Sequence, residues 1–127
     1  MEKENVIKNK SFVFAIEIVS LYKVLAERKE FILSKQLLRS GTSIGANIRE
    51  SEHAQSKADF IHKLSIALKE ANETEYWLDL LYETKYVSES EFQSIKPKVI
   101  EILKILVSII NTSKRKIIIN YSFSIVN

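Results

Sequence analysis

The sequence predicts an all-α protein, an antiparallel up-down-up-down four-helix bundle, and three observations support this fold class. The 127 residues include only two glycines and one proline, while Leu, Ile, Lys, Glu and Ala dominate, which is a helical composition. Apolar residues recur at helical spacing in four separate segments. Serines stand where three of the helices should begin, and the connecting segments are short, so successive helices should run antiparallel.

The first helix is expected to run from about Ser11 to Arg28. Its inward stripe consists of Phe14, Ile18, Leu21 and Leu25. A second set of apolar residues occupies much of the remaining circumference: Phe12, Val13, Ile16, Val19 and Val24. Because a helix that is apolar nearly all round must be buried on more than one side, a second subunit is a natural cover for this set.

The second helix is expected to begin at Ser34, which has the side chain of a good N-cap, and to end near Gln55. The only glycines of the chain, Gly41 and Gly45, lie inside it, four residues apart. Each costs about 1 kcal/mol relative to Ala in a helix interior, so their presence predicts that another helix packs closely there. The alternative is a break in the helix at residues 40–42.

The third helix is expected to begin with a capping box formed by Ser56 and Asp59, and to continue to about Thr84. Its core stripe consists of Phe60, Leu64, Ala67, Ala71, Leu78 and Leu81. A second stripe, formed by Ile66, Trp77 and Leu80, points away from the first. This second stripe is predicted to be an oligomer face.

The last helical segment is expected to begin with a second capping box, formed by Ser88 and Glu91. Pro97 disfavours helical angles at the residue before it, which predicts a short helix to about residue 94 and then a kink or restart. An amphipathic helix should follow and end near Ser113. The bundle domain is therefore expected at residues 1–113. Residues 114–127 form a basic and then apolar tail, expected to be disordered or packed as an extended strand on a neighbour.

The composition indicates in which cellular compartment the protein is expected. The chain has no cysteine, so disulfides and thiolate metal ligands are excluded, and the cytoplasm is the expected location. Residues 1–10 do not resemble a secretory signal. The apolar run at residues 12–26 is interrupted by Glu17 and Lys23 and is shorter than the ~20 residues of a membrane span, so no membrane partner is expected.

Two acid–histidine pairs are the only candidates for a metal site or a catalytic site. Glu50 and His53 have the Glu-x-x-His spacing of carboxylate-bridged metal sites, and Asp59 and His62 nearly repeat it. Both pairs lie at the junction of the second and third helices, whereas a di-metal bundle needs inward-facing carboxylates on the other helices as well. A solvated surface is therefore favoured, and no metal, cofactor or catalytic residue is predicted.

Basic residues provide the candidate nucleic-acid contacts, which would bind phosphates in a salt-sensitive and largely sequence-independent way. These residues are Lys35, Arg39, Arg49, Lys57, Lys114, Arg115 and Lys116. A second, overlapping set is interpreted as a packing or oligomer motif: Arg39, Gly41, Gly45, Asn47, Glu50, Ile66, Trp77 and Leu80.

Three stretches carry a resemblance to a known family: residues 33–50 (LSKQLLRSGTSIGANIRE), residues 56–60 (SKADF) and residues 65–77 (SIALKEANETEYW). Over about residues 5–113 the sequence resembles the four helix bundle protein family, also called the 23S rRNA intervening-sequence-encoded or S23 ribosomal protein family. The resemblance implies a bacterial homopentameric ring with no established enzymatic activity. The accessory variability determinant protein of diversity-generating retroelements, a relative of that family, binds nucleic acid and a reverse transcriptase.

The expected function is therefore a non-enzymatic homo-oligomeric scaffold or adaptor, with itself, RNA or DNA, and a protein such as a reverse transcriptase as candidate partners. The alternatives are a metal-dependent bundle enzyme using Glu50, His53, Asp59 and His62, and a toxin–antitoxin or phage-related interaction module.

Overall fold

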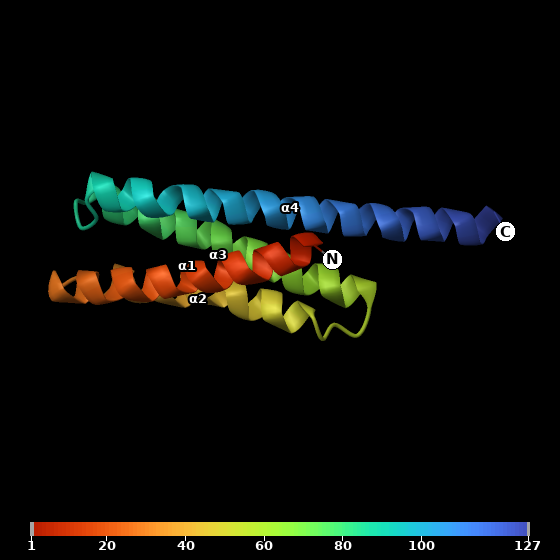
Figure 1. The fold of residues 1–127 in the computed structure, drawn as a ribbon, viewed down its shortest axis with the longest axis horizontal. Coiled ribbons are helices and arrows are strands. Elements are labelled where there is room, and N and C mark those ends of the chain that lie inside the picture. Colours follow the sequence, from red (N-terminus) through yellow and green to blue (C-terminus); the bar gives the residue numbers. More distant parts are fainter. Residues whose placement is uncertain (1, 127) are drawn as a thin grey trace.

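The computed structural model describes residues 2–126, and the side chains of residues 2–123. Over these residues the chain forms four helices: α1 (Glu2–Glu27), α2 (Leu33–Ser51), α3 (Lys57–Glu83) and α4 (Glu89–Val126). Each helix packs against the next, and α4 returns to α1, so the order around the bundle is that of the chain (Figure 1). The predicted all-α, up-down-up-down bundle is confirmed.

The core runs along the bundle axis and takes apolar residues from all four helices. Its largest fully buried side chains are Ile7, Phe14, Ile18, Leu25, Leu37, Ile44, Leu64, Leu78, Leu81, Val99, Ile102 and Leu106. The predicted inward stripe of the first helix and the core stripe of the third are buried, apart from Phe60, which is half-buried. Helix α1 begins at Glu2, earlier than the expected Ser11, because Ile7 extends its buried stripe by two turns.

Helix α2 begins in a different way from the one predicted. Ser34 is not the N-cap, and its side chain is buried inside the first turn. The cap is Glu30, whose Oε1 accepts hydrogen bonds from the amides of Ile32 and Leu33, and whose Oε2 accepts one of 2.7 Å from the amide of Ser34. Burial raises the pKa of the Glu30 carboxyl, but these amide hydrogen bonds outweigh that effect and lower it below its usual value.

The two glycines mark where α1 and α2 approach most closely. An ideal Cβ built on Gly41 would lie 2.9 Å from both Cγ1 and Cγ2 of the buried Ile18. At Gly45 the same atom would meet the hydroxyl and carbonyl oxygens of Ser11 at 3.3 and 3.4 Å. The predicted close packing is confirmed, and the alternative of a break at residues 40–42 is wrong, since α2 is continuous there.

Both capping boxes are confirmed. Ser56 Oγ accepts from the amide of Asp59, whose carboxylate accepts from the amide of Gln55. Ser88 and Glu91 exchange the same kind of bonds at the start of α4. Arg28, at the end of α1, adds a two-pronged ion pair to Glu91, with both N–O distances 2.8 Å.

Helices α1 and α3 end in the same manner. The amide of Glu30 bonds the carbonyl of Leu25, and the amide of Tyr86 bonds that of Leu81, each reaching back five residues. This arrangement requires a left-handed residue just beyond the helix, usually glycine. Here the residues are Lys29 (φ 63°) and Lys85 (φ 68°).

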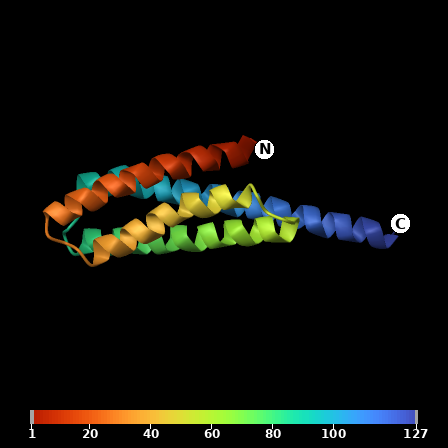
Figure 2. The ribbon, with the colours of Figure 1, turned by 90° about the horizontal axis from the view of Figure 1, so that it is seen from below.

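The last helix differs most from the prediction. The expected interruption near Pro97 does not occur, since Pro97 lies inside a continuous α4. Buried Ile95 and Val99 anchor the helix on both sides of the exposed proline, and this packing outweighs a cost of about 3 kcal/mol. The expected end near Ser113 is also wrong, because residues 114–126 continue the helix and project beyond the other three (Figures 1 and 2). Residue 127 lies outside the described residues, and packing on a neighbour stays a prediction.

Candidate functional site

The outer side of α1 carries the candidate functional surface. Four large apolar side chains there, which we call the outer stripe, are exposed: Phe12 (54%), Val13 (53%), Ile16 (53%) and Val19 (36%). They lie on the same two turns as the buried Phe14 and Ile18. The expected second apolar side of this helix is therefore present, and no helix of the described chain covers it.

A groove runs along one flank of the outer stripe, between α1 and α2. It has a volume of about 400 Å³, and small residues, including Ala15, Gly45 and Ala46, form part of its lining. The Phe12 ring and the Arg49 side chain also line it, and the guanidinium lies 5.7 Å from the ring centroid, within cation–π range. Small side chains thus leave room beside a large aromatic ring.

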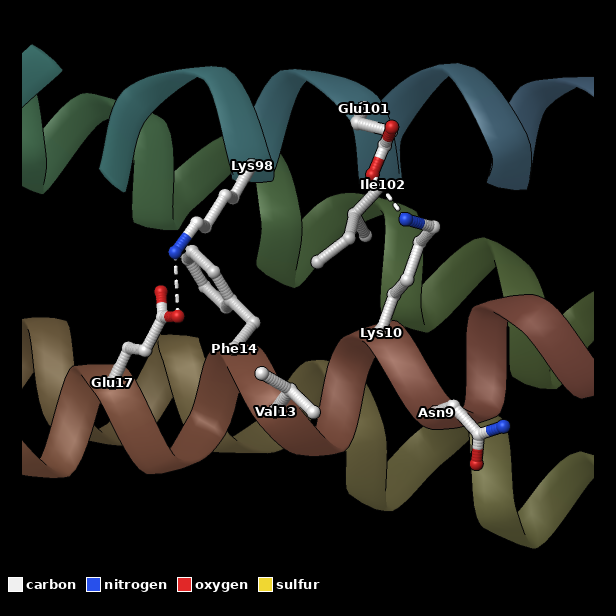
Figure 3. A pocket seen from close by; sticks show the side chains of 8 residues that line it. All are labelled: Asn9, Lys10, Val13, Phe14, Glu17, Lys98, Glu101 and Ile102. Carbon is white, nitrogen blue, oxygen red and sulfur yellow. Dashed lines mark hydrogen bonds and ion pairs between the residues drawn. The ribbon is translucent and has the colours of Figure 1, made fainter. Parts of the chain in front are cut away.

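A second groove of about 330 Å³ runs along the other flank, between α1 and α4. Figure 3 shows Phe14 between two ion pairs that bridge the helices. Lys98 Nζ lies 2.5 Å from Glu17 Oε1, and Lys10 Nζ lies 2.8 Å from Glu101 Oε1. Both grooves can accept apolar atoms from a partner, and charged pairs border the second.

The basic residues predicted on α2 do not form one patch. Arg39 is engaged with α3, through Glu70 at 3.3 Å and through Glu73, and Arg49 lies against Phe12. Lys35 is in the first turn of α2, whereas Lys57 begins α3 at the opposite end of the bundle. An α2 of 19 residues, about 28 Å long, separates them.

The bundle end near Lys57 does bring basic residues together. Lys57 and Lys116 line one pocket of about 360 Å³, which Glu4 and Glu52 also line. Lys114 and Arg115 directly precede Lys116 on the same turn of α4 and are exposed. Of the predicted basic residues, the structure therefore brings together Lys57 and Lys116.

The predicted packing motif divides into inward and outward members. Gly41 and Gly45 pack against α1, as described above. Asn47 donates a hydrogen bond of 2.8 Å to the carbonyl of Ser43 within α2, and Glu50 lies 3.4 Å from the Lys63 ammonium on α3. Ile66, Trp77 and Leu80 are half-buried, with the Tyr76 ring set edge-on to Trp77.

The acid–histidine pairs do not assemble. His53 and His62 are exposed, and the Asp59 carboxylate is engaged in capping α3. Within the part of the chain that the structure describes, no group of three His, Cys, Asp or Glu side chains could hold a metal ion. The metal-dependent alternative therefore finds no ligand set among these residues.

Two polar side chains that stabilise the turns of the bundle were not predicted from the sequence. Glu30 caps α2, and Arg28 joins the two turns at one end of the bundle by bonding both Glu91 and the Tyr86 carbonyl. An acidic residue four positions before Ser34 was the available signal for the Glu30 cap. No local pattern indicates Arg28, since its partner is 63 residues away.

Among residues 2–126 no helix is both long and apolar enough to cross a membrane. This finding includes the long helix α4.

Comparisons with known proteins give the same family as the sequence resemblance. A family model described as 23S rRNA-intervening sequence protein matches residues 3–108. A solved structure of a protein of unknown function from the S23 ribosomal protein family of Bacteroides thetaiotaomicron is 64% identical, with a TM-score of 0.84. That match covers 86% of this chain and 98% of the other, whereas no curated protein matches. The chain therefore belongs to the 23S rRNA-intervening sequence protein family.

Proposed function

We propose that this protein is a non-enzymatic homo-oligomeric scaffold, a pentamer as the family resemblance implies, whose subunits meet over the outer stripe of α1. The observation that carries this proposal is the exposure of Phe12, Val13 and Ile16, each more than half exposed, on a helix already buried on its inner side. Removing apolar surface from water gains roughly 25 cal/mol for each Å², so these three side chains, together with Val19, favour a protein contact.

The surroundings of the outer stripe favour an interface in which side chains of the two subunits interdigitate. Grooves of about 400 and 330 Å³ flank it, so a neighbouring subunit could place side chains on both sides of the Phe12–Ile16 ridge. A closed ring needs two different surfaces on each subunit. The half-buried set Ile66, Trp77 and Leu80 lies on α3, diagonally across the bundle from α1, and is the candidate for the second surface.

Light scattering on the purified protein tests this proposal. The wild type should have about five times the mass of the 14.7 kDa subunit. The double variant Phe12→Ser/Ile16→Ser should shift towards the monomer while keeping its helical circular dichroism. Val107→Ser is the matched control, because Val107 is an exposed apolar residue on α4 outside the stripe, at 41%.

Two outcomes would overturn the proposal. A wild type that is monomeric at micromolar concentration removes the oligomer, and dissociation by Val107→Ser but not by the double variant moves the interface away from α1. Binding of RNA or DNA through the basic residues stays a prediction; Arg39 and Arg49 are already engaged within the subunit. The same applies to a reverse transcriptase as partner.

A further inference from the structure

The C-terminal part of α4 extends past the bundle. Lys3, at the start of α1, donates a hydrogen bond of 2.8 Å to Ser108 of α4. The first turn of α1 therefore lies beside Ser108. Ser113 is the last buried residue, and every described side chain from Lys114 onward is exposed. We call residues 114–126 the α4 extension. It is a helix of about 20 Å that no other part of the described chain covers (Figure 2).

The α4 extension has two chemically different parts. Lys114, Arg115 and Lys116 come first, and the sequence contains no Asp or Glu after Glu101. Of the three, Lys116 lines a pocket together with Glu4 and Glu52, whereas Lys114 and Arg115 line none of the pockets described above. A strongly apolar turn follows, in which Ile118, Ile119 and Tyr121 are 63%, 64% and 68% exposed. A partner for this segment must therefore offer negative charge and, directly beside it, an apolar phase.

Two other occupants, a nucleic acid and a second copy of this segment, fit only one of the two parts. A nucleic acid would bind the three cations but offers nothing to three consecutive isoleucines. A second α4 extension packed in parallel would cover the isoleucines but would bring two triply charged segments together, which is unfavourable. The family match ends at residue 108, so the extension also lies outside the region that identifies the family.

We propose that the α4 extension binds the surface of a bilayer that contains anionic lipids. The three cations would lie against the negatively charged headgroups, and Ile117–Ile119 would enter the boundary between headgroups and acyl chains, with Tyr121 at the same level. In this arrangement the extension lies on the membrane or enters one leaflet. No membrane partner is predicted from the sequence, because only a spanning helix, at residues 12–26, is considered there and not a segment that lies on the surface.

Vesicle co-sedimentation with the full chain tests the proposal. We expect binding to vesicles of phosphatidylcholine mixed with phosphatidylserine, and much weaker binding to phosphatidylcholine alone. The triple variant Lys114→Gln/Arg115→Gln/Lys116→Gln should bind the mixed vesicles roughly a hundredfold more weakly, since each cation near such a surface contributes about 1 kcal/mol. The double variant Ile118→Ser/Ile119→Ser should lose about tenfold or more on the same vesicles.

A matched control removes the same charge elsewhere. Lys23, Lys69 and Lys104 are exposed on α1, α3 and α4, and their combined change to Gln should leave vesicle binding within about twofold of the wild type. All these positions are outside the core, so circular dichroism should be unchanged. Light scattering reads the oligomer separately, so failure here would not count against the proposed scaffold.

The overturning results are distinct. No binding to the mixed vesicles at low salt would remove the proposal. Equal losses in the control and in the Lys114–Lys116 variant would show only a net-charge effect. Binding that survives Ile118→Ser/Ile119→Ser would mean that the apolar part does not take part. Tight binding of RNA through Lys114–Lys116, without vesicle binding, would assign the segment to nucleic acid instead.

Discussion

Both sides of α1 are apolar in sequence, but only the inner side is covered by other helices of the described chain. On the inner side Phe14 and Ile18 are 1% and 0% exposed, and α2 carries a glycine where Ile18 needs space. On the outer side Phe12 and Ile16 are more than half exposed, with open grooves on both flanks. Burial of an apolar residue therefore depends on a complementary surface, and for the outer side we infer that another subunit supplies it.

Truncating one phenylalanine on each side gives the largest contrast. Phe14→Ala should lower the free energy of unfolding by about 3–5 kcal/mol, because it leaves a cavity in the core. Phe12→Ala should lower the stability of the single subunit by less than about 1 kcal/mol, mainly through the lost contact with Arg49. Urea unfolding at several protein concentrations measures both and separates subunit stability from assembly.

Equal losses at Phe12 and Phe14, independent of protein concentration, would contradict the distinction between the two sides. A loss at Phe12 that grows with protein concentration would instead sharpen it, because the side chain would then be buried only in the oligomer.

The two glycines test how tightly the inner side is packed. Gly41→Ala gains about 1 kcal/mol of helix propensity but places a methyl group against Ile18, which is fully buried. We expect a net loss of about 1–2 kcal/mol. Gly45→Ala, one turn along the same helix, should change stability by less than about 0.5 kcal/mol, since its clash with Ser11 is milder.

Thermal or urea unfolding of the two alanine variants makes this comparison directly. A Gly41→Ala protein more stable than the wild type would show that Ile18 can relocate, and that the inner side is packed less closely than the distances indicate.

The inner contact also depends on the α1–α2 turn, and acid should weaken it. Because the folded-state pKa of Glu30 is lowered, its contribution is complete above the ordinary value of 4.5 and is lost as the pH falls through the lower folded value. Glu30→Gln should cost about 1 kcal/mol at pH 7, since an amide cannot accept from all three backbone donors.

The difference between wild type and Glu30→Gln should therefore shrink below about pH 4.5, which urea unfolding across a pH series would measure. Glu91 acts in the same direction in both proteins, because its bonds to Arg28 lower its pKa to about 2. A difference that stays constant down to pH 3 would show that the charge of Glu30 plays no part in the turn.

Much of this fold could be predicted from the sequence, because its signals are local. The inward stripes, the capping boxes at Ser56 and Ser88, and close packing at the glycines depend on residues a few positions apart. The failures occur where distant contacts decide. Packing of Ile95 and Val99 overrides Pro97, and the Glu30 carboxylate replaces the cap expected at Ser34.

The candidate surfaces were less predictable. The excess apolar residues of the first helix indicated the outer stripe, but not the grooves, which need neighbouring helices in place. The engagement of Arg39 with Glu70 and Glu73 depends on residues more than 30 positions away. The tail is predicted to be disordered or extended, and its β-branched residues do disfavour a helix. The segment lacks any glycine or proline, however, to stop a helix that is already formed.

The lysines at the two left-handed turns have a consequence for protein engineering. Lys29 and Lys85 occupy the conformation in which a side chain is strained and glycine is not. Both turns lie at the end of the bundle opposite the α4 extension (Figure 1). Glycine at these two positions would relieve backbone strain far from the extension. The resulting protein should be more stable, and destabilising variants could then be purified in that background.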